Sequence, residues 1–282
     1  MAMPPILVAD LFPEVTRRLV ELLRSLSAEE WQLPTVSSRR TVKDIASHLL
    51  DGSLRRLSMQ RDGYRPADGR SQPQPGEPLL DFLNRLNDEW ETGTRRLSPK
   101  VLVDLIEWAD AQLADLFRSL DPHGPAIFPV AWAGEERSEN WMDVARDYTE
   151  KWHHTQQLFD ATGRPSTLLT RLVGHPCLDI FMRALPFTFR EVDAAVGSLV
   201  TVAVTGEAGG NWHVERQEGG WAQIVGPPRS AVATVTMDQD TAWKLVTKRR
   251  SREANLRSFP AIRITGDEAL GLPVLDMVSV MA

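Results

Sequence analysis

The chain has 282 residues, a formal net charge of -6 at pH 7 and a single cysteine, Cys177, so no intrachain disulfide can form. The length predicts two domains, and the acidic balance argues against a general nucleic-acid binder, which needs a concentrated basic surface. Because the N-terminus lacks a basic segment followed by a long apolar core, and the apolar stretch at residues 194–205 is too short to span a bilayer, we expect a soluble, cytoplasmic protein without a membrane partner.

Long helices dominate the N-terminal part, where apolar residues recur at helical spacing. Thr41 is expected to cap one helix, with Asp44 three residues later completing a capping box. Ser98 is expected to cap another helix, and Gly163 to end the last one. The expected helices are residues 10–25, 42–60, 79–97, 99–120 and 138–163. Residues 126–136 look extended, as a short hairpin or a lid.

The pattern changes after residue 165, where short alternating segments replace the long helices. Paired glycines at 209–210 and 219–220 suit tight hairpins. The expected strands are residues 198–205, 211–216, 221–225, 232–237 and 261–265, and the expected helices are 167–189, 240–248 and 268–281. The sequence therefore predicts a two-domain α + α/β chain: an antiparallel four-helix bundle over residues 1–165, then a smaller α+β domain over residues 166–282 with an antiparallel sheet.

His48, Glu150 and His154 have the residue types of a metal site. Glu150 and His154 are four residues apart on one expected helix, so they share a face. His48 falls on the flank of the apolar stripe of another helix. Two imidazoles and a carboxylate, with a fourth position open, are typical of a catalytic zinc site. Spacing alone leaves open that Glu150 and His154 form a solvated pair and that His48 is merely a polar flank residue.

His153 offers Glu150 a second pairing, at the Glu-x-x-His spacing of carboxylate-bridged di-iron bundles. Such sites need a second Glu-x-x-His, and no other histidine here has a glutamate three residues before it. The His-Glu-x-x-His signature of zinc proteases is absent as well. These patterns make a di-iron centre or a protease of that type a poor match.

Two runs, VKDIASHLL at residues 42–50 and WMDVARDYTEKWHHTQQLFDATG at residues 141–163, resemble the mycothiol-dependent maleylpyruvate isomerase family of the DinB-like metal-binding superfamily. Residues 263–270, RITGDEAL, are more loosely similar to that family's smaller α/β domain. The resemblance implies a DinB-like bundle in which His48, Glu150 and His154 hold a divalent metal, most commonly zinc.

The same resemblance implies a reaction, thiol-assisted isomerisation of maleylpyruvate to fumarylpyruvate. We therefore expect a metal-dependent isomerase or transferase in which a low-molecular-weight thiol such as mycothiol, held by the metal as thiolate, is the nucleophile. Its partners would be this thiol and a small-molecule substrate. Two alternatives stay open: a non-catalytic metal-containing binding or stress-associated protein, and a metal-dependent hydrolase that uses bound water.

One basic run could bind anionic groups. Its members are Lys248, Arg249, Arg250, Arg252 and Arg257. Such a run is more often a solvated face or a complement to a helix dipole. The functional alternative is a carboxylate clamp, for which Arg249 is the candidate catalytic residue, although this segment departs from the family's glycine-arginine pattern.

The remaining candidates have structural explanations that compete with functional ones. Cys177 has no base-and-orienter arrangement nearby, which favours a buried thiol over a nucleophile. Tryptophans at helical spacing are more typical of a core than of a cavity lining. Those in question are Trp132, Trp141 and Trp152. The candidates for orienting the metal ligands are Asp44, Arg146, Asp147 and Tyr148.

Overall fold

The computed structural model describes residues 3–37, 39–67, 71–226, 230–248 and 250–280. Contacts divide the chain into two compact units. The helical unit comprises Ala9–Asp121 and His154–Thr167, and the sheet unit comprises Met1–Val8, Pro122–His153 and Leu168–Ala282. This division follows contacts and does not test the domain boundary expected after residue 165, which stays a prediction. Within the described ranges, no helix combines the length and apolarity that a membrane crossing requires.

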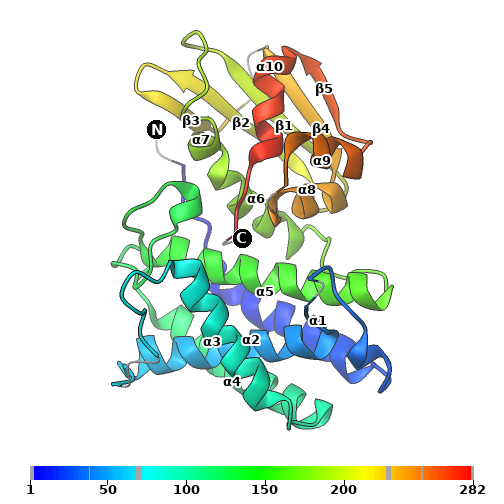
Figure 1. Ribbon diagram of the computed structural model, residues 1–282. Helices are drawn as coiled ribbons and strands as arrows, with labels where there is room; N and C mark the ends of the chain where they lie inside the picture. Colours follow the sequence, from blue (N-terminus) through cyan, green and yellow to red (C-terminus); the bar gives the residue numbers. More distant parts are fainter. Residues whose placement is uncertain (1–2, 38, 68–70, 227–229, 249, 281–282) are drawn as a thin grey trace. The chain divides into compact units, whose positions relative to one another are not determined.

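The helical unit contains the long helices expected from the N-terminal sequence (Figure 1). They are α1 (Phe12–Arg24), α2 (Val42–Arg56), α3 (Leu79–Thr94), α4 (Pro99–Ser119) and the last part of α5 (Asn140–Thr162). The Thr41 hydroxyl accepts from Asp44 N, and the Asp44 carboxylate accepts from Thr41 N, so the expected capping box is confirmed. The Ser98 cap is confirmed too, since its hydroxyl accepts from Val101 N. Gly163 follows α5 with a φ of +64°, as expected of a helix-ending glycine.

A polar clamp lies in the core of the helical unit, where α4 packs against α1 and α2. The Asp110 carboxylate on α4 accepts hydrogen bonds from Thr16 on α1, at 2.9 Å, and from Ser53 on α2, at 2.7 Å. Asp110 is 3% exposed, so three helices are joined in an environment without competing water. Helix α3 buries only Thr94 among its described residues, so it lies at the edge of this core.

The sheet unit is built on one five-stranded sheet in the order β3-β2-β1-β4-β5. The strands are β1 (Leu199–Thr205), β2 (Gly210–Gln217), β3 (Gly220–Ile224), β4 (Ala233–Asp238) and β5 (Arg263–Gly266). The expected antiparallel sheet is wrong in one pair, because β4 runs parallel to β1, with Val202 opposite Val235. Alternation of apolar and polar residues reports which face a residue occupies. It does not report strand direction, which is why the sequence pattern missed this.

Helices of the sheet unit cover its strands: α7 contacts β3, α8 contacts β1 and β4, and α10 contacts β4 and β5. All the helices of this unit after α5 are α6 (Gly174–Phe181), α7 (Leu185–Thr188), α8 (Gln239–Val246), α9 (Arg252–Ser258) and α10 (Glu268–Gly271), as far as the residues are described. The single helix expected over residues 167–189 is broken between α6 and α7, and Pro186 lies in the first turn of α7. The helix expected over residues 268–281 ends early, in a 3-10 segment that begins at Leu272 and contains Pro273. Both differences have the same cause: proline has no amide hydrogen and its ring blocks the preceding turn, so an α-helix cannot continue through it.

Residues 126–136 were expected to be extended, but their regular element is a 3-10 turn at Ala131–Ala133. Helix α9 was not expected at all. It is short, and the basic residues around it gave no apolar periodicity to detect.

Candidate metal centre

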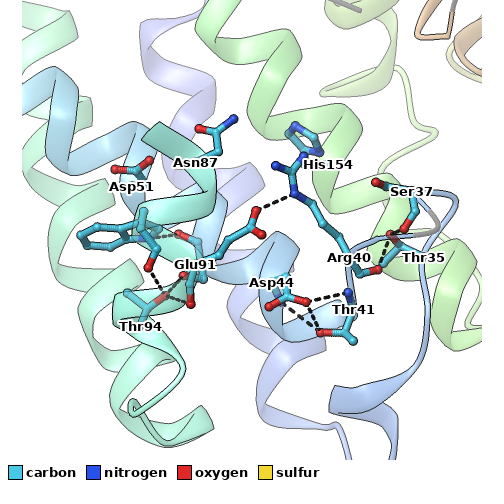
Figure 2. A network of polar contacts seen from close by, with 12 residues as sticks. Thr35, Ser37, Arg40, Thr41, Asp44, Asp51, Asn87, Glu91, Thr94 and His154 are labelled. Atoms are coloured by element: carbon cyan, nitrogen blue, oxygen red, sulfur yellow. Dashed lines mark hydrogen bonds and ion pairs between the residues drawn. The ribbon is translucent and has the colours of Figure 1, made fainter. Parts of the chain in front are cut away.

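The position of His48 is fixed by the start of α2 and by α3 beside it. The Thr41 cap sets where α2 begins, and His48 lies about two turns later on the same helix. Its neighbour Ser47 shares a hydrogen bond of 2.6 Å with the Thr94 hydroxyl, and the Ser47 carbonyl accepts from Trp90 Nε1 at 2.9 Å. Both bonds join α2 to α3, and Figure 2 shows Thr94 of α3 in this network. The backbone that carries His48 is therefore held on the side facing α3.

His48, Glu150 and His154 lie together. Each offers one ligand atom, and these atoms are all within 4.8 Å of one another. Glu150 and His154 are one turn apart on α5, so the helix itself sets their spacing. The rings of His48 and His154 meet edge to face, with centroids 4.8 Å apart and planes at 79°. All three side chains are half-buried, which leaves them accessible to a small ligand.

The proton on the His154 ring is positioned by Gln157, a residue that the sequence analysis missed. Nδ1 of His154 lies 2.9 Å from Oε1 of Gln157, one turn further along α5. Because an amide oxygen only accepts hydrogen bonds, this contact favours a proton on Nδ1, and in the neutral ring Nε2 then keeps its lone pair. That is the tautomer a metal-binding histidine requires. The only signal in the sequence was the glutamine at i+3, which is too common a pattern to single out.

The side chain of His153 has a different environment from that of His154. It is 4% exposed, and its Nδ1 lies 3.0 Å from the backbone oxygen of Thr149. It does not belong to the cluster of possible ligand atoms found in the described part of the chain. The Glu-x-x-His pairing considered from the sequence is therefore not the one that the fold brings together.

Charged groups from the loop before α2, from α2 and from α3 lie in a network of polar contacts that includes His154 (Figure 2). Nε of Arg40 lies 2.5 Å from the Glu91 carboxylate, and burial raises the pKa of Glu91 while Arg40 opposes that rise. Asp51 is three residues after His48 on α2 and is 5% exposed. Burial raises the pKa of Asp51 to about 6, and its ion pair of 2.5 Å with Arg55 offsets only part of this effect.

We expect Asp51→Asn to stabilise the metal-free protein at pH 7 and to have no such effect at pH 4. The folded-state pKa of about 6 lies above the ordinary 3.8, so the folded protein binds the proton more tightly and loses stability as pH rises through this window. Asparagine resembles the protonated carboxyl group and avoids the penalty, which is up to roughly 3 kcal/mol above pH 6. Urea unfolding at both pH values measures the difference; a destabilised variant at pH 7 contradicts the prediction.

The other proposed orienting residues make structural contacts. Arg146 pairs with Asp143 at 2.9 Å and with Asp147 at 2.7 Å. Burial opposes the charge of Arg146, yet Asp147 and Asp143 raise its pKa, so it stays protonated. The Tyr148 hydroxyl donates to the Val173 carbonyl at 2.8 Å within the sheet unit. Asp44 belongs to the capping box of α2.

The competing structural explanations hold for the cysteine and for the most buried tryptophan. Trp152 is fully buried and meets Trp243 edge to face at 6.2 Å, as a core residue does. Burial raises the pKa of the Cys177 thiol well above its usual range, and the charge of Glu150 adds to that rise. Cys177 is therefore a neutral thiol and a poor nucleophile.

The basic run after α8 makes ordinary helix-end and surface contacts where it is described. Arg250 donates to the Lys244 carbonyl in the last turn of α8, which favours a positive charge. Arg252 pairs with Asp276 on the surface. Arg249, the candidate for a carboxylate clamp, lies outside the described residues.

Comparison with known families gives the cluster a context. The sequence model of the mycothiol maleylpyruvate isomerase N-terminal domain matches residues 12–159. The chain belongs to this family. The family match spans His48, Glu150 and His154. No curated protein matches the sequence significantly.

Two crystal structures of a mycothiol-dependent maleylpyruvate isomerase, one of them a histidine-to-alanine mutant, are similar in fold. Each superposes with a TM-score of 0.50 and 11% sequence identity, covering 86% of this chain and 91% of the other. At this identity the likeness concerns the fold alone. It extends beyond the family match, since it covers most of both chains.

Proposed function

We propose that this protein is a metal-dependent, low-molecular-weight-thiol-dependent isomerase or transferase of the maleylpyruvate isomerase type. The observation that carries the proposal is the convergence of His48, Glu150 and His154, within 4.8 Å of one another, inside the region that matches the family. Family membership suggests the thiol and the small-molecule substrate. The residues of the cluster suggest how a metal would be held.

The donor set fits a divalent cation, and zinc in particular. Two imidazole nitrogens and one carboxylate oxygen are the ligands of open, catalytic zinc sites. Zinc bonds of about 2.0 to 2.2 Å hold two ligand atoms no more than about 4.4 Å apart. The separations here reach as far as 4.8 Å, so only small side-chain rotations are needed to bring the atoms within bonding reach. The His154 tautomer set by Gln157 is already the competent one.

Each of the three residues would then contribute differently to binding the cation. His48 and His154 contribute neutral donors from two helices, and Glu150 contributes the negative charge that offsets part of the cation's charge. When bound, the cation would supply Lewis acidity and would keep a cofactor thiol such as mycothiol in its thiolate form at neutral pH. We further propose that α1, α2, α4 and α5 form the antiparallel bundle of a domain that ends near residue 165. We also propose that Arg249 contacts an anionic group of the substrate.

Turnover measurements on purified protein test this function directly. Metal content is measured first, and maleylpyruvate is then supplied with and without mycothiol. We expect bound metal at about one ion per chain and isomerisation that requires both metal and thiol. Metal-dependent activity that does not require the thiol would favour a hydrolase that uses bound water. Bound metal with no turnover in a broad substrate panel would favour a binding protein.

Gln157→Ala is expected to weaken metal binding by about 10- to 100-fold, because the His154 ring loses the acceptor that fixes its tautomer. Competition with a chromophoric chelator measures the affinity. Gln157→Glu keeps an oxygen acceptor at the same position and should retain most of the affinity. Equal affinities for the alanine variant and the wild type would show that Gln157 has no part in orienting the ligand.

A further inference from the structure

A cavity of about 590 Å³ opens in the sheet unit, and none of the three cluster residues lines it. Its walls come from residues 3–7, from helix α6 with the residues on either side of it, and from strands β2 and β3. This volume lies in the range of small-molecule sites, which are commonly about 300 to 1,000 Å³. The function proposed above does not use this cavity.

The lining has more positive than negative charge. Arg171 and Arg183 face one carboxylate, that of Asp179. One oxygen of Asp179 already accepts a hydrogen bond of 2.8 Å from Trp212 Nε1. Arg171 donates to the Gly209 carbonyl at 3.1 Å. Within the described ranges neither arginine has a carboxylate partner at ion-pair distance.

Arg183 is incompletely satisfied by the protein. Its Nη2 donates to the Pro4 carbonyl at 2.6 Å, and its guanidinium lies 5.6 Å from the Trp141 ring. Its Nε is buried and has no acceptor among the described groups. Burial lowers the pKa of Arg183, although Asp179 and Glu135 oppose this. An anion beside this guanidinium would accept from the buried Nε and would add to the partial compensation that Asp179 and Glu135 give.

Two histidines, His175 and His213, add hydrogen-bonding groups to the lining. His175 Nδ1 lies 3.0 Å from the Ala208 oxygen and 3.1 Å from Nη1 of Arg171, so polar contacts hold this ring beside Arg171. The His175 ring stacks on Trp212 with centroids 5.7 Å apart. Burial lowers the pKa of His213, which favours its neutral form. A Cβ on Gly210 would lie 3.0 Å from the His175 ring, so a side chain there would crowd this packing.

The remaining lining is apolar. It includes Pro4, Pro5, Ile6 and Leu7 of the N-terminal segment and Ile224 and Val225 at the end of β3. Leu7 and Val225 are 65% and 68% exposed, which is costly for apolar side chains that nothing covers. One part of the cavity thus suits an anion, and the other suits a hydrophobic body.

We propose that this cavity binds a small carboxylic acid with an apolar body, its carboxylate beside Arg183 and Arg171 and its body against the apolar wall. A planar carboxylate matches the fork of donors that a guanidinium presents. Inorganic anions would satisfy the charge but would leave the apolar wall uncovered. The site is independent of the metal cluster and of the function proposed for it.

Calorimetric titration of the metal-free, full-length protein with benzoate tests the assignment, because chelation removes any carboxylate binding to a metal. We expect the wild type to bind one benzoate per chain. Benzoate should bind at least about tenfold more weakly to Arg183→Gln, and benzamide, the uncharged analogue, at least about tenfold more weakly to the wild type. Arg171→Gln, at an exposed position, should also weaken binding and serves if the first variant folds poorly. Arg190→Gln is the matched control, since Arg190 is exposed, pairs with Glu191 and lies outside the lining.

Three results would overturn the proposal. Benzamide binding as tightly as benzoate would remove the role of the carboxylate. Inorganic phosphate binding as tightly as benzoate would remove the role of the apolar wall. Unchanged benzoate affinity in both Arg171→Gln and folded Arg183→Gln would place any binding elsewhere.

Discussion

His48→Ala and His154→Ala are each expected to lower metal affinity by more than about 100-fold, so that the purified variants lose most of their metal. Each substitution removes one of the three donors that the described residues bring within reach of a common centre. Loss of a direct ligand should exceed the 10- to 100-fold effect of losing a group that merely orients one. Metal content by mass spectrometry, with affinity from chelator competition, measures the result.

The variants should stay folded, because both histidines are half-buried and truncation leaves no large cavity in the core. Helical circular dichroism equal to that of the wild type would establish this. His123→Ala is the matched control: this histidine is exposed, lies 3.1 Å from Glu139 and is outside the cluster. Stoichiometric metal retained in both cluster variants would contradict the assignment.

Asp110→Ala is expected to destabilise the protein by about 3 kcal/mol or more. The carboxylate accepts from Thr16 and Ser53 at a position that is 3% exposed. Removing it takes this acceptor from two buried hydroxyls, although Ser53 keeps a longer hydrogen bond of 3.3 Å to the Leu49 carbonyl, and each unsatisfied buried group costs about 1 to 3 kcal/mol. Urea unfolding measures the change, as a lower midpoint with an unchanged slope.

Asp104→Ala on the same helix is the control for this experiment. The Asp104 side chain is 50% exposed and pairs with Lys100 four residues earlier. Exposed pairs of this kind contribute little, so the change should stay within about 0.5 kcal/mol. Similar losses in the two variants would mean that the buried clamp does not join the three helices as described.

The sequence predicted only part of the candidate site. Glu150 and His154 are joined by helix periodicity, which is a local property, so their shared face followed from spacing. His48 lies on another helix, and spacing alone left open that it was a polar flank residue. Family resemblance favoured the cluster, and the fold brings its ring to 4.8 Å from that of His154. The role of Gln157 required the direction of its amide, which no sequence pattern contains.

The sequence by itself determined the helix boundaries that depend on local hydrogen bonds and backbone geometry. Thr41 with Asp44, Ser98 and Gly163 act within a few residues of their own positions, and each is confirmed. Tertiary structure alone decided the parallel pairing of β1 with β4 and the approach of His48 to His154. Such contacts join segments far apart in the chain, and their geometry depends on how whole elements pack, which local periodicity does not encode.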